Sequence, residues 1–392
     1  MEWNWTVAIW AGACLVIGSL ILGKKKKGSQ GRRPPGPPGW PIIGNIFDLG
    51  VDAHQSLATL SRKYGPVMWL QLGATNTLVV SSAEVAMEMF KKHDLAISDR
   101  AINEGFKTDG YDQASMVLAP YGTFWRMMRR IYTTELFTNN RIKATEEFRT
   151  KSMDKMLEWM WKDAQEKGSV EVARFIEIMN FNAIGNAIFS KDIVDPIFNR
   201  GTEFFTSTTQ ALELIIQPNV ADFFPWLRWL DPQRVKKKMK PIMRRIISFS
   251  SSLVKERILD RENGKRNEKK DFLDVMLDFQ GNQLDGESAK LSERNISVGI
   301  QELLQAATDT STSTIEWAMT ELLRNPKIMR KVEAVTASSS LIHTFEWSLE
   351  DGTTPDKINV NEKLGLTLRK ADPLKVVLKL RSAAENVAKM DQ

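Results

Sequence analysis

The chain has 392 residues, 42% of them hydrophobic, which is enough for a sizeable core in one large domain or two to three smaller ones. Its net charge of +6 is uneven, with basic blocks at 24–33 and 236–245, but neither accompanies a zinc-finger or RNA-binding signature, so nucleic acid is not an expected partner. The single cysteine, Cys14, excludes an internal disulfide framework and a cysteine-rich metal site, and indicates a reducing compartment for most of the chain.

The first 23 residues predict a membrane anchor. Residues 3–23 carry no charged side chain, and as a helix they span roughly 30 Å, about the hydrocarbon thickness of a bilayer. Lys24 to Lys27 follow directly, which places this end in the cytosol by the positive-inside rule. A cleaved secretory signal is the alternative, but it would carry its positive charge before the apolar run. We therefore expect a single-pass anchor over 1–23 with a cytosolic body, and the basic residues beside it favour contact with the bilayer.

A basic and proline-rich segment, residues 24–45, follows the predicted anchor. Proline fixes φ and removes a backbone donor, so the run PPGPPGWP at 34–41 predicts a stiff, non-helical spacer. Together with IIGN at 42–45 it resembles the hinge of microsomal cytochrome P450s, especially the large plant group. That resemblance implies an endoplasmic reticulum membrane protein whose hinge orients a cytosolic body against the bilayer.

Residues 46–335 predict a body that is mainly α-helical with small β-sheets. Strand-like runs at 67–73 and 77–80 lie on either side of a turn region near Gly73, and a helix over 82–90 begins at a Ser82 cap. Residues 141–180 are helical in pattern, and the highly charged stretch 260–270 predicts an exposed loop or a frayed helix end. We find no internal repeat and no clear second domain. The resemblance implies the cytochrome P450 fold, here incomplete.

The motif PYGTFWRMMRR at 120–130 predicts a loop followed by a helix. Residues four apart share a helix face, so Trp125 and Arg129 come together and offer an indole N–H and a guanidinium to an anion. By spacing alone, an ordinary amphipathic helix with a surface arginine is the more common structure. The motif as a whole is similar to the P450 helix that holds a haem propionate, which implies that Trp125 and Arg129 bind the cofactor.

A second motif, AATDTST at 306–312, lies in a region of helical periodicity. The hydroxyl-rich run 308–314 is compatible with one long bent helix or with two helices joined by a Ser/Thr loop. The string resembles the P450 helix that crosses the haem, which implies proton delivery by Asp309 and Thr310 and cofactor contacts by Ala306 and Ala307. The family usually has glycine at the position of Ala307. After this helix, Asn325-Pro326 predicts a cap and the first turn of another.

The resemblance is interrupted after residue 335. The expected E-x-x-R helix, aromatic-Arg segment and cysteine loop are missing, and residues 336–375 instead resemble the C-terminal hairpin of the same family. Apolar and polar residues alternate at 345–349 and 364–368, which predicts strands, and Asp351-Gly352 predicts a turn. Residues 376–392 are a tail in which we expect an amphipathic basic helix.

This interruption removes the axial thiolate on which P450 oxygen chemistry depends. Cys14 lies in the predicted anchor, and the three histidines show no paired spacing, so no metal ligand is expected: His54, His93 and His343. The resemblance implies haem, NADPH supplied through a partner reductase, and a small lipophilic substrate such as a terpenoid. Two hypotheses follow: a haem monooxygenase by ancestry, or a non-catalytic, membrane-anchored truncated product. Neither a G-x-S-x-G elbow nor a phosphate-binding G-x-x-x-x-G-K loop is present, which disfavours hydrolase and nucleotide-binding functions.

Overall fold

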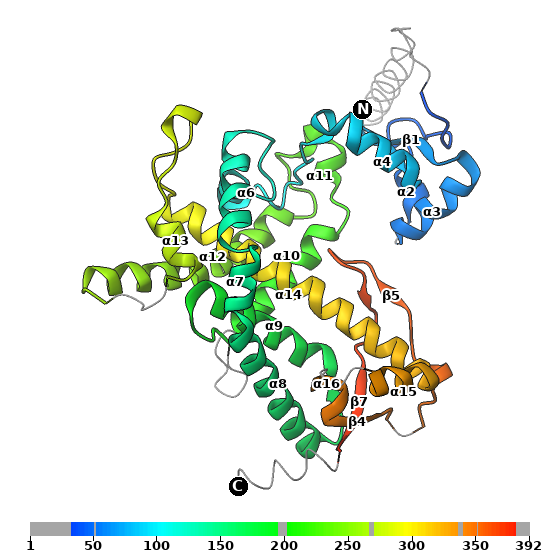
Figure 1. The fold of residues 1–392 in the computed structure, drawn as a ribbon. Helices are drawn as coiled ribbons and strands as arrows, with labels where there is room; N and C mark the ends of the chain where they lie inside the picture. Colours follow the sequence, from blue (N-terminus) through cyan, green and yellow to red (C-terminus); the bar gives the residue numbers. More distant parts are fainter. Residues whose placement is uncertain are drawn as a thin grey trace, which may run out of the picture. The chain divides into compact units, whose positions relative to one another are not determined.

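The computed structural model describes residues 33–50, 52–194, 202–265, 270–335, 340–350 and 352–381. The predicted anchor and the last eleven residues lie outside them. Within the described ranges, no helix is both long enough and apolar enough to cross a bilayer. The chain forms two compact units, one of residues 1–97 and 219–232, and one of residues 98–218 and 233–392. Each is mainly helical with small sheets, as the sequence predicted (Figure 1).

The first unit is built on a two-stranded antiparallel sheet, β1 and β2, that pairs Val67 with Val80. Its other elements are short helices, and the bounds of all of them are α2 (Ile46–Leu49), α3 (Ala53–Tyr64), β1 (Val67–Leu72), β2 (Thr75–Val80), α4 (Ala83–Lys92), η1 (Asp94–Ile97), α11 (Val220–Phe223) and η3 (Pro225–Leu227). The predicted strands and the Ser82 cap are confirmed, since the Ser82 hydroxyl accepts from the Val85 N–H at 3.4 Å.

The proline-rich segment packs against β1. The Trp69 N–H donates to the Pro35 carbonyl at 2.9 Å, and the Gln71 N–H donates to the Asn45 side chain at 2.9 Å. Gly73 follows β1 with φ +61°, and an added Cβ there would lie 2.6 Å from the Phe223 carbonyl oxygen. Only glycine combines that backbone conformation with so close an approach. The described part of the hinge therefore packs against β1 and is hydrogen-bonded to it.

The second unit holds the remaining elements, whose bounds are η2 (Thr108–Gly110), α5 (Tyr111–Ala114), α6 (Thr123–Glu135), α7 (Asn139–Ala144), α8 (Glu146–Lys167), β3 (Val170–Glu171), α9 (Val172–Phe189), α10 (Thr202–Ile216), α12 (Val235–Glu262), α13 (Phe272–Asp278), η4 (Gln283–Asp285), α14 (Glu293–Arg324), α15 (Pro326–Val335), α16 (Ser340–Thr344), β4 (Phe345–Ser348), η5 (Pro355–Lys357), β5 (Glu362–Lys363), β6 (Arg369–Lys370) and β7 (Lys375–Leu380). The predicted helical stretch 141–180 thus contains α8 and the first half of α9, separated by the short β3.

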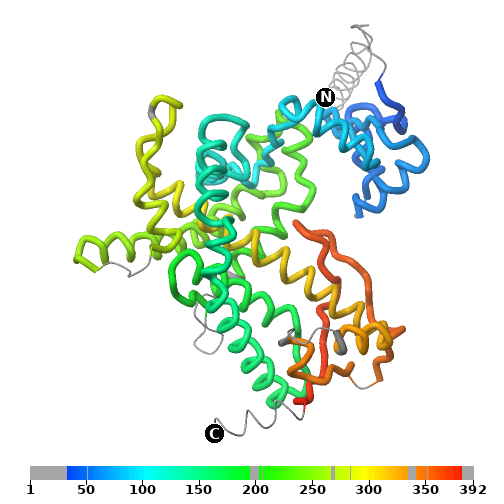
Figure 2. Tube along the Cα trace, in the orientation of Figure 1, coloured from blue at the N-terminus to red at the C-terminus, as the bar shows by residue number. Residues whose placement is uncertain are grey.

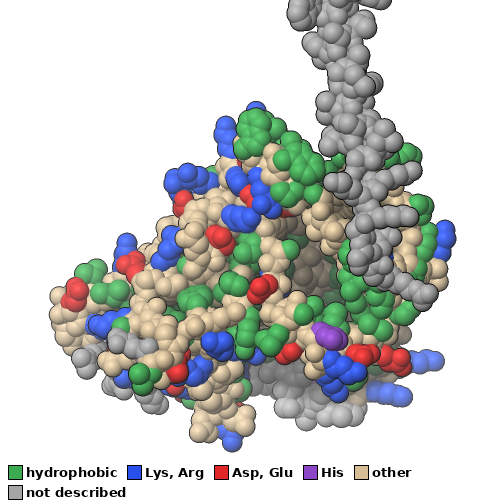
Figure 3. Space-filling view, turned by 90° about the horizontal axis from the view of Figure 1, so that it is seen from above, with side chains coloured by type: hydrophobic (Ala, Val, Ile, Leu, Met, Phe, Trp, Pro, Cys, Tyr) green, Lys and Arg blue, Asp and Glu red, His purple; other side chains and the backbone are tan. Residues whose placement is uncertain are grey.

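Two apolar clusters form the core of the second unit. One surrounds the first half of α14 with side chains from α6, α9, α10, α12 and α13, and the other surrounds its second half with α8, α9, α15 and the C-terminal strands. Charges of both signs are interspersed with apolar side chains on the face shown in Figure 3. α14 therefore runs through both clusters, and the packing of the unit is organised along it.

The C-terminal region differs from expectation in two places. Residues 376–380 were expected in the amphipathic helix of the tail, but they belong to β7, which runs as extended chain at the red end of the trace in Figure 2. β7 pairs with β3 and β4. The buried Val376 and Leu378 are two residues apart, and the residues on either side of each are more exposed, which is the period of a half-buried strand. Leu364, Leu366 and Leu368 were expected in a strand, but they lie between β5 and β6. β4 is confirmed at 345–348, and the rest of the predicted tail lies outside the described residues.

An ion-pair network fixes the end of α12 to α13. Arg257 donates to both carboxylate oxygens of Asp271 at 2.9 and 2.8 Å and lies 2.9 Å from Asp274. It also donates to the Phe189 carbonyl at the end of α9 at 3.0 Å. Asp271 caps α13, and both aspartates are buried. The arginine therefore joins three helices, α12 and α13 through largely buried ion pairs and α9 through a backbone carbonyl.

We predict that Arg257→Ala lowers the free energy of unfolding by about 3–5 kcal/mol, because it leaves the buried Asp271 without its cation, whereas Asp274 keeps its ion pair with Arg261. Urea denaturation of the full chain in detergent measures the change. Lys167→Ala, which removes a partly exposed pair with Asp163 on α8, is the matched control and should cost less than about 1 kcal/mol. Equal effects of the two substitutions would contradict the role assigned to Arg257.

Candidate functional site

The second motif lies in the middle of one continuous helix, α14 (Glu293–Arg324), so the two-helix alternative is wrong. The Ser292 hydroxyl caps its start by accepting from the Asn295 N–H at 3.1 Å. The hydroxyl-rich run remains helical because its side chains donate to carbonyls one turn earlier. Thr308 and Thr310 do so to Leu304 and Ala306, at 2.7 and 2.8 Å. The predicted helix after Asn325-Pro326 is confirmed as α15.

One face of α14, which we call the open face, consists of Leu303, Ala306, Ala307 and Thr310. These residues recur every three to four positions and therefore share a side of the helix. Ala306 and Thr310 are exposed, and the other two are half-buried. The side chains are small, and the Thr310 hydroxyl is directed at its own helix. The open face therefore offers a flat, accessible surface at the position of the AATDTST motif.

Helix α6 (Thr123–Glu135) meets the same side of α14 two turns earlier. Trp125, Arg129 and Tyr132 lie on one face of α6 because they are four and three residues apart. The Tyr132 hydroxyl approaches Gly299, whose spacing from Leu303 and Ala306 places it in line with the open face. Trp125 is half-buried beside the Tyr121 ring, with ring centroids 5.6 Å apart, and Arg129 is exposed. By helical spacing Trp125 and Arg129 share a face of α6, and Tyr132, one turn further along that face, is the residue that approaches α14.

A second side of α14 carries three buried carboxylates, Glu302, Asp309 and Glu316, exposed by only 8%, 4% and 4%. They are seven residues apart, which is close to two helical turns, so they form one stripe along the helix. Sequence reasoning identified Asp309 through its motif and missed the other two. The seven-residue spacing of acids within an apolar helix is the signal that could have revealed them.

Glu302 is surrounded by hydroxyl and amide donors from α5 and the loop after it. The Ser115 hydroxyl and the Tyr111 hydroxyl donate to its carboxylate, the latter at 3.3 Å, and the Met116 N–H does so at 3.2 Å. Burial raises the pKa of Glu302 to about 7, although these donors favour the charged form. Glu302 is therefore a carboxyl group that titrates near neutral pH inside the core.

Asp309 is held by the C-terminal segment. The Thr367 hydroxyl donates to one carboxylate oxygen at 2.7 Å, and Arg369 forms an ion pair with the other. Arg369 also lies 3.6 Å from Glu177 of α9, whose pKa is raised by burial although the arginine opposes that shift. Asp309 thus faces this polar cluster, on a different side of α14 from the adjacent Thr310, so the two residues expected to act together point in different directions.

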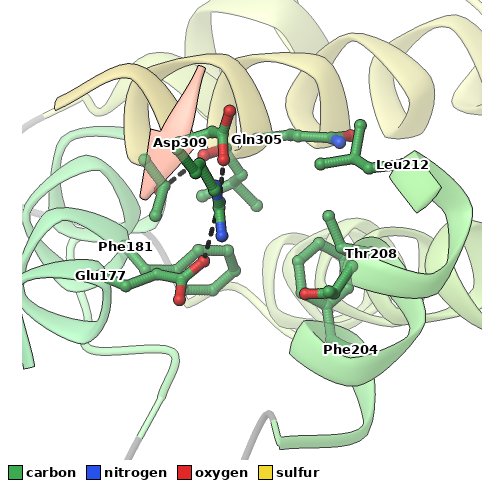
Figure 4. A pocket seen from close by; sticks show the side chains of 11 residues that line it. Glu177, Phe181, Phe204, Thr208, Leu212, Gln305 and Asp309 are labelled. Atoms are coloured by element: carbon green, nitrogen blue, oxygen red, sulfur yellow. Dashed lines mark hydrogen bonds and ion pairs between the residues drawn. The ribbon is translucent and has the colours of Figure 1, made fainter. Parts of the chain in front are cut away.

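A pocket lies beside Asp309, between α9, α10 and α14 (Figure 4). It contains about 330 Å³ of space, part of it open to solvent, but the volume that the centre of a water-sized molecule can occupy is only about 20 Å³, enough for little more than one water. Phe181 and Glu177 line it from α9, Phe204 and Thr208 from α10, and Gln305 and Asp309 from α14. These α14 residues lie away from the open face, so the pocket and the open face are separate features.

The cofactor expected from the resemblance can be compared with the side chains present. The open face and the Trp125–Arg129 face could receive a flat ring and its carboxylates. An axial thiolate has no donor, because the one cysteine of the chain is at position 14. Within the described ranges, no group of three or more His, Cys, Asp or Glu side chains could hold a metal ion. The residues of the body therefore fit the edges of a haem but not thiolate ligation of its iron.

Comparison with known proteins gives the class. Residues 34–338 match the model of the family described as Cytochrome P450. The chain is 44% identical over 333 residues to iridoid oxidase of Catharanthus roseus, covering 83% of this chain and 64% of that protein. It is 43% identical over 339 residues to cytochrome P450 76A2 of Solanum melongena, covering 85% and 66%. Geraniol 8-hydroxylase of Catharanthus roseus is 34% identical over 300 residues, covering 76% and 60%.

The chain belongs to the cytochrome P450 family. Within that family it is similar to the plant branch that includes monoterpenoid hydroxylases, as the motifs indicated. The alignments span less than two thirds of the length of each of these three relatives. Members of the family use haem and receive electrons from a reductase. The fold and motifs of the second unit therefore have their origin in a haem monooxygenase.

The approach of α6 to α14 yields a first prediction for this site. A methyl group at position 299 would overlap the Tyr132 hydroxyl, which has no hydrogen-bond partner among the described residues. We expect Gly299→Ala to destabilise the chain by about 1–3 kcal/mol. Tyr132→Phe should cost little by itself and should restore most of the loss in the double variant. Thermal denaturation of the four proteins measures this coupling, and strictly additive effects would contradict the contact.

The raised pKa of Glu302 yields a second prediction. Between its unfolded value of 4.5 and its folded value of about 7, the folded chain binds more protons than the unfolded chain. The stability that Glu302 contributes is therefore complete below pH 4.5 and is lost as the pH rises through about 7. The melting temperature of Glu302→Gln, relative to that of the wild type, should therefore increase as the pH is raised from about 5 to about 8.

Glu321→Gln removes an exposed carboxylate from the same helix and provides the control for this measurement. Its profile should follow that of the wild type across this range. A pH-independent difference between Glu302→Gln and the wild type would mean that Glu302 does not titrate in the core.

Proposed function

We propose that this chain is a membrane-anchored, non-catalytic relative of the plant monooxygenases that hydroxylate small lipophilic metabolites such as terpenoids. The single observation that carries this proposal is that no thiol occurs between residues 33 and 381, the part of the chain that contains the whole described body. Oxygen activation in the family requires a cysteine thiolate that pushes electron density toward the O–O bond. Neither a histidine nor a carboxylate supplies an equivalent ligand.

The setting of Asp309 supports the same proposal. A proton-delivering acid needs access to water and to the reacting group. Asp309 is almost fully buried, accepts from Thr367 and is paired with Arg369, while Thr310 donates to the Ala306 carbonyl. We propose that Asp309 and Thr310 derive from the proton-delivery pair of the family and that here Asp309 anchors the C-terminal segment. Trp125 and Arg129, with Ala306 and Ala307, are proposed remnants of the cofactor surface.

The location follows from the predicted anchor. We propose that residues 1–23 cross the endoplasmic reticulum membrane once, that 24–45 form the hinge, and that the body faces the cytosol. Residues 46–335 are then the N-terminal part of a P450 domain, 336–375 its C-terminal hairpin region, and 376–392 a tail. NADPH-cytochrome P450 reductase is the partner of active relatives, and we propose no productive electron transfer from it to this chain.

The test is a carbon-monoxide difference spectrum of the full chain, purified in detergent and supplied with haem and reductant. We expect no thiolate-type Soret band, and no oxidation of geraniol in the presence of NADPH and the reductase. Cys14→Ser is the control and should behave identically, because the anchor thiol is not expected to reach the body. A thiolate-type band, or an oxidised product, from protein whose intact mass matches these 392 residues would refute the proposal.

A further inference from the structure

The hairpin of residues 362–370, β5 (Glu362–Lys363) and β6 (Arg369–Lys370), is attached to its unit mainly by polar contacts. Leu366 and Leu368 are exposed by 61% and 39%, so the hairpin contributes little to the apolar core. The Leu368 carbonyl accepts from the Ser313 hydroxyl and from the Trp317 indole N–H, both at 2.9 Å. Without a large buried apolar surface, the position of the hairpin depends on these bonds and on its charges.

The charged contacts of the hairpin reach three helices. Arg369 pairs with Asp309 of α14 and approaches Glu177 of α9, and Lys363 lies 3.2 Å from Glu213 of α10. Those helices are the ones that enclose the pocket, and Arg369 is itself one of the residues that line it. The hairpin therefore forms a wall of the pocket and ties the other walls together.

We propose that the hairpin is a lid, latched by Arg369 between Asp309 and Glu177, and that its release opens the pocket to a small apolar molecule bearing a hydroxyl group. The ligand class follows from the lining. Phe181, Phe204, Leu212 and Leu304 supply apolar walls. The buried Thr208 hydroxyl, which has no hydrogen-bond partner among the described residues, would gain one from such a ligand.

The latch has the properties of a contact that can open. Its single cation faces two carboxylates and is 35% exposed, so water and dissolved ions reach it. The pocket has room for little more than one water molecule while the hairpin is in place, so binding of an organic ligand requires that the lid open. The proposal rests on the proposed function only in its choice of a small lipophilic ligand, since the latch itself is independent of haem chemistry.

Hydrogen–deuterium exchange of the full chain in detergent tests the latch. In Arg369→Ala, amides of residues 358–372 and of α10 should exchange at least about tenfold faster than in the wild type, because the ion pair that closes the lid is lost. Arg381→Ala removes a pair with Glu333 elsewhere in the C-terminal segment and is the matched control. Unchanged exchange at the hairpin in Arg369→Ala, or the same acceleration in Arg381→Ala, would overturn the lid.

Arg369→Lys is a second variant that distinguishes loss of the latch from a general folding defect. It keeps the positive charge but loses the planar fork of donors, so exchange at the hairpin should lie between the wild type and Arg369→Ala. Protection of α8 should be the same in all of these proteins. Uniform loss of protection across α8 and the hairpin in Arg369→Lys would count against a local latch.

Geraniol, followed by tryptophan fluorescence, tests the ligand. When only a fraction of the molecules have an open lid, the apparent affinity for geraniol is reduced to that fraction of its intrinsic value. Arg369→Ala should therefore bind geraniol at least about tenfold more tightly than the wild type and Arg381→Ala do. Thr208→Val in the Arg369→Ala background should reverse part of that gain. Equal binding by all variants would overturn the assignment of the pocket. A thiolate-type carbon-monoxide spectrum would instead overturn the proposed function and leave these results unaffected.

Discussion

The stripe of buried carboxylates on α14 is the constraint on which the second unit depends. Each ionised carboxylate removed from water must find donors or a cation, since an uncompensated buried charge costs several kcal/mol. Glu302 finds its donors in Tyr111, Ser115 and Met116, and Asp309 finds Thr367 and Arg369. Glu316 accepts from the Leu374 N–H at 2.8 Å. Through Glu302 the helix holds a segment that precedes it in the chain. Through Asp309 and Glu316 it holds two segments that follow it.

This arrangement gives the two sides of α14 different roles. The open face keeps small side chains and accessible surface, with α6 crossing it at Gly299. The carboxylate side is covered by polar partners and by the pocket. Here the carboxylate side carries the contacts that hold the described C-terminal strands, because Asp309 and Glu316 bind the segment that leads into β7.

The chain thus combines the motifs of the cytochrome P450 family with a body, residues 33–381, that contains no thiol. A thiolate cannot be replaced by proximity of other groups, since its role is electronic. The acid and the hydroxyls of the second motif are polar residues, and such residues can stabilise packing through hydrogen bonds and ion pairs. Asp309 is an example, because its carboxylate neutralises Arg369 of the C-terminal hairpin.

The sequence by itself determined the helical character of the body, the β1–β2 hairpin, the cap at Ser82, the helix that begins at Pro326, the family motifs and the lack of a thiol in the body. Each of these is set by local periodicity, by a turn residue or by composition. It left open whether the hydroxyl-rich run breaks α14. It wrongly placed 376–380 in a helix, because these residues form a strand only by pairing with β3 and β4.

Only the tertiary structure decided which partners the buried acids have. Arg369 lies 60 residues from Asp309, and Tyr111 lies 191 residues from Glu302. No local pattern encodes these pairs, because they arise from where the chain returns to α14 after folding. The environment of each carboxylate, and hence its role, is therefore set by the tertiary fold that brings distant segments of the chain to α14.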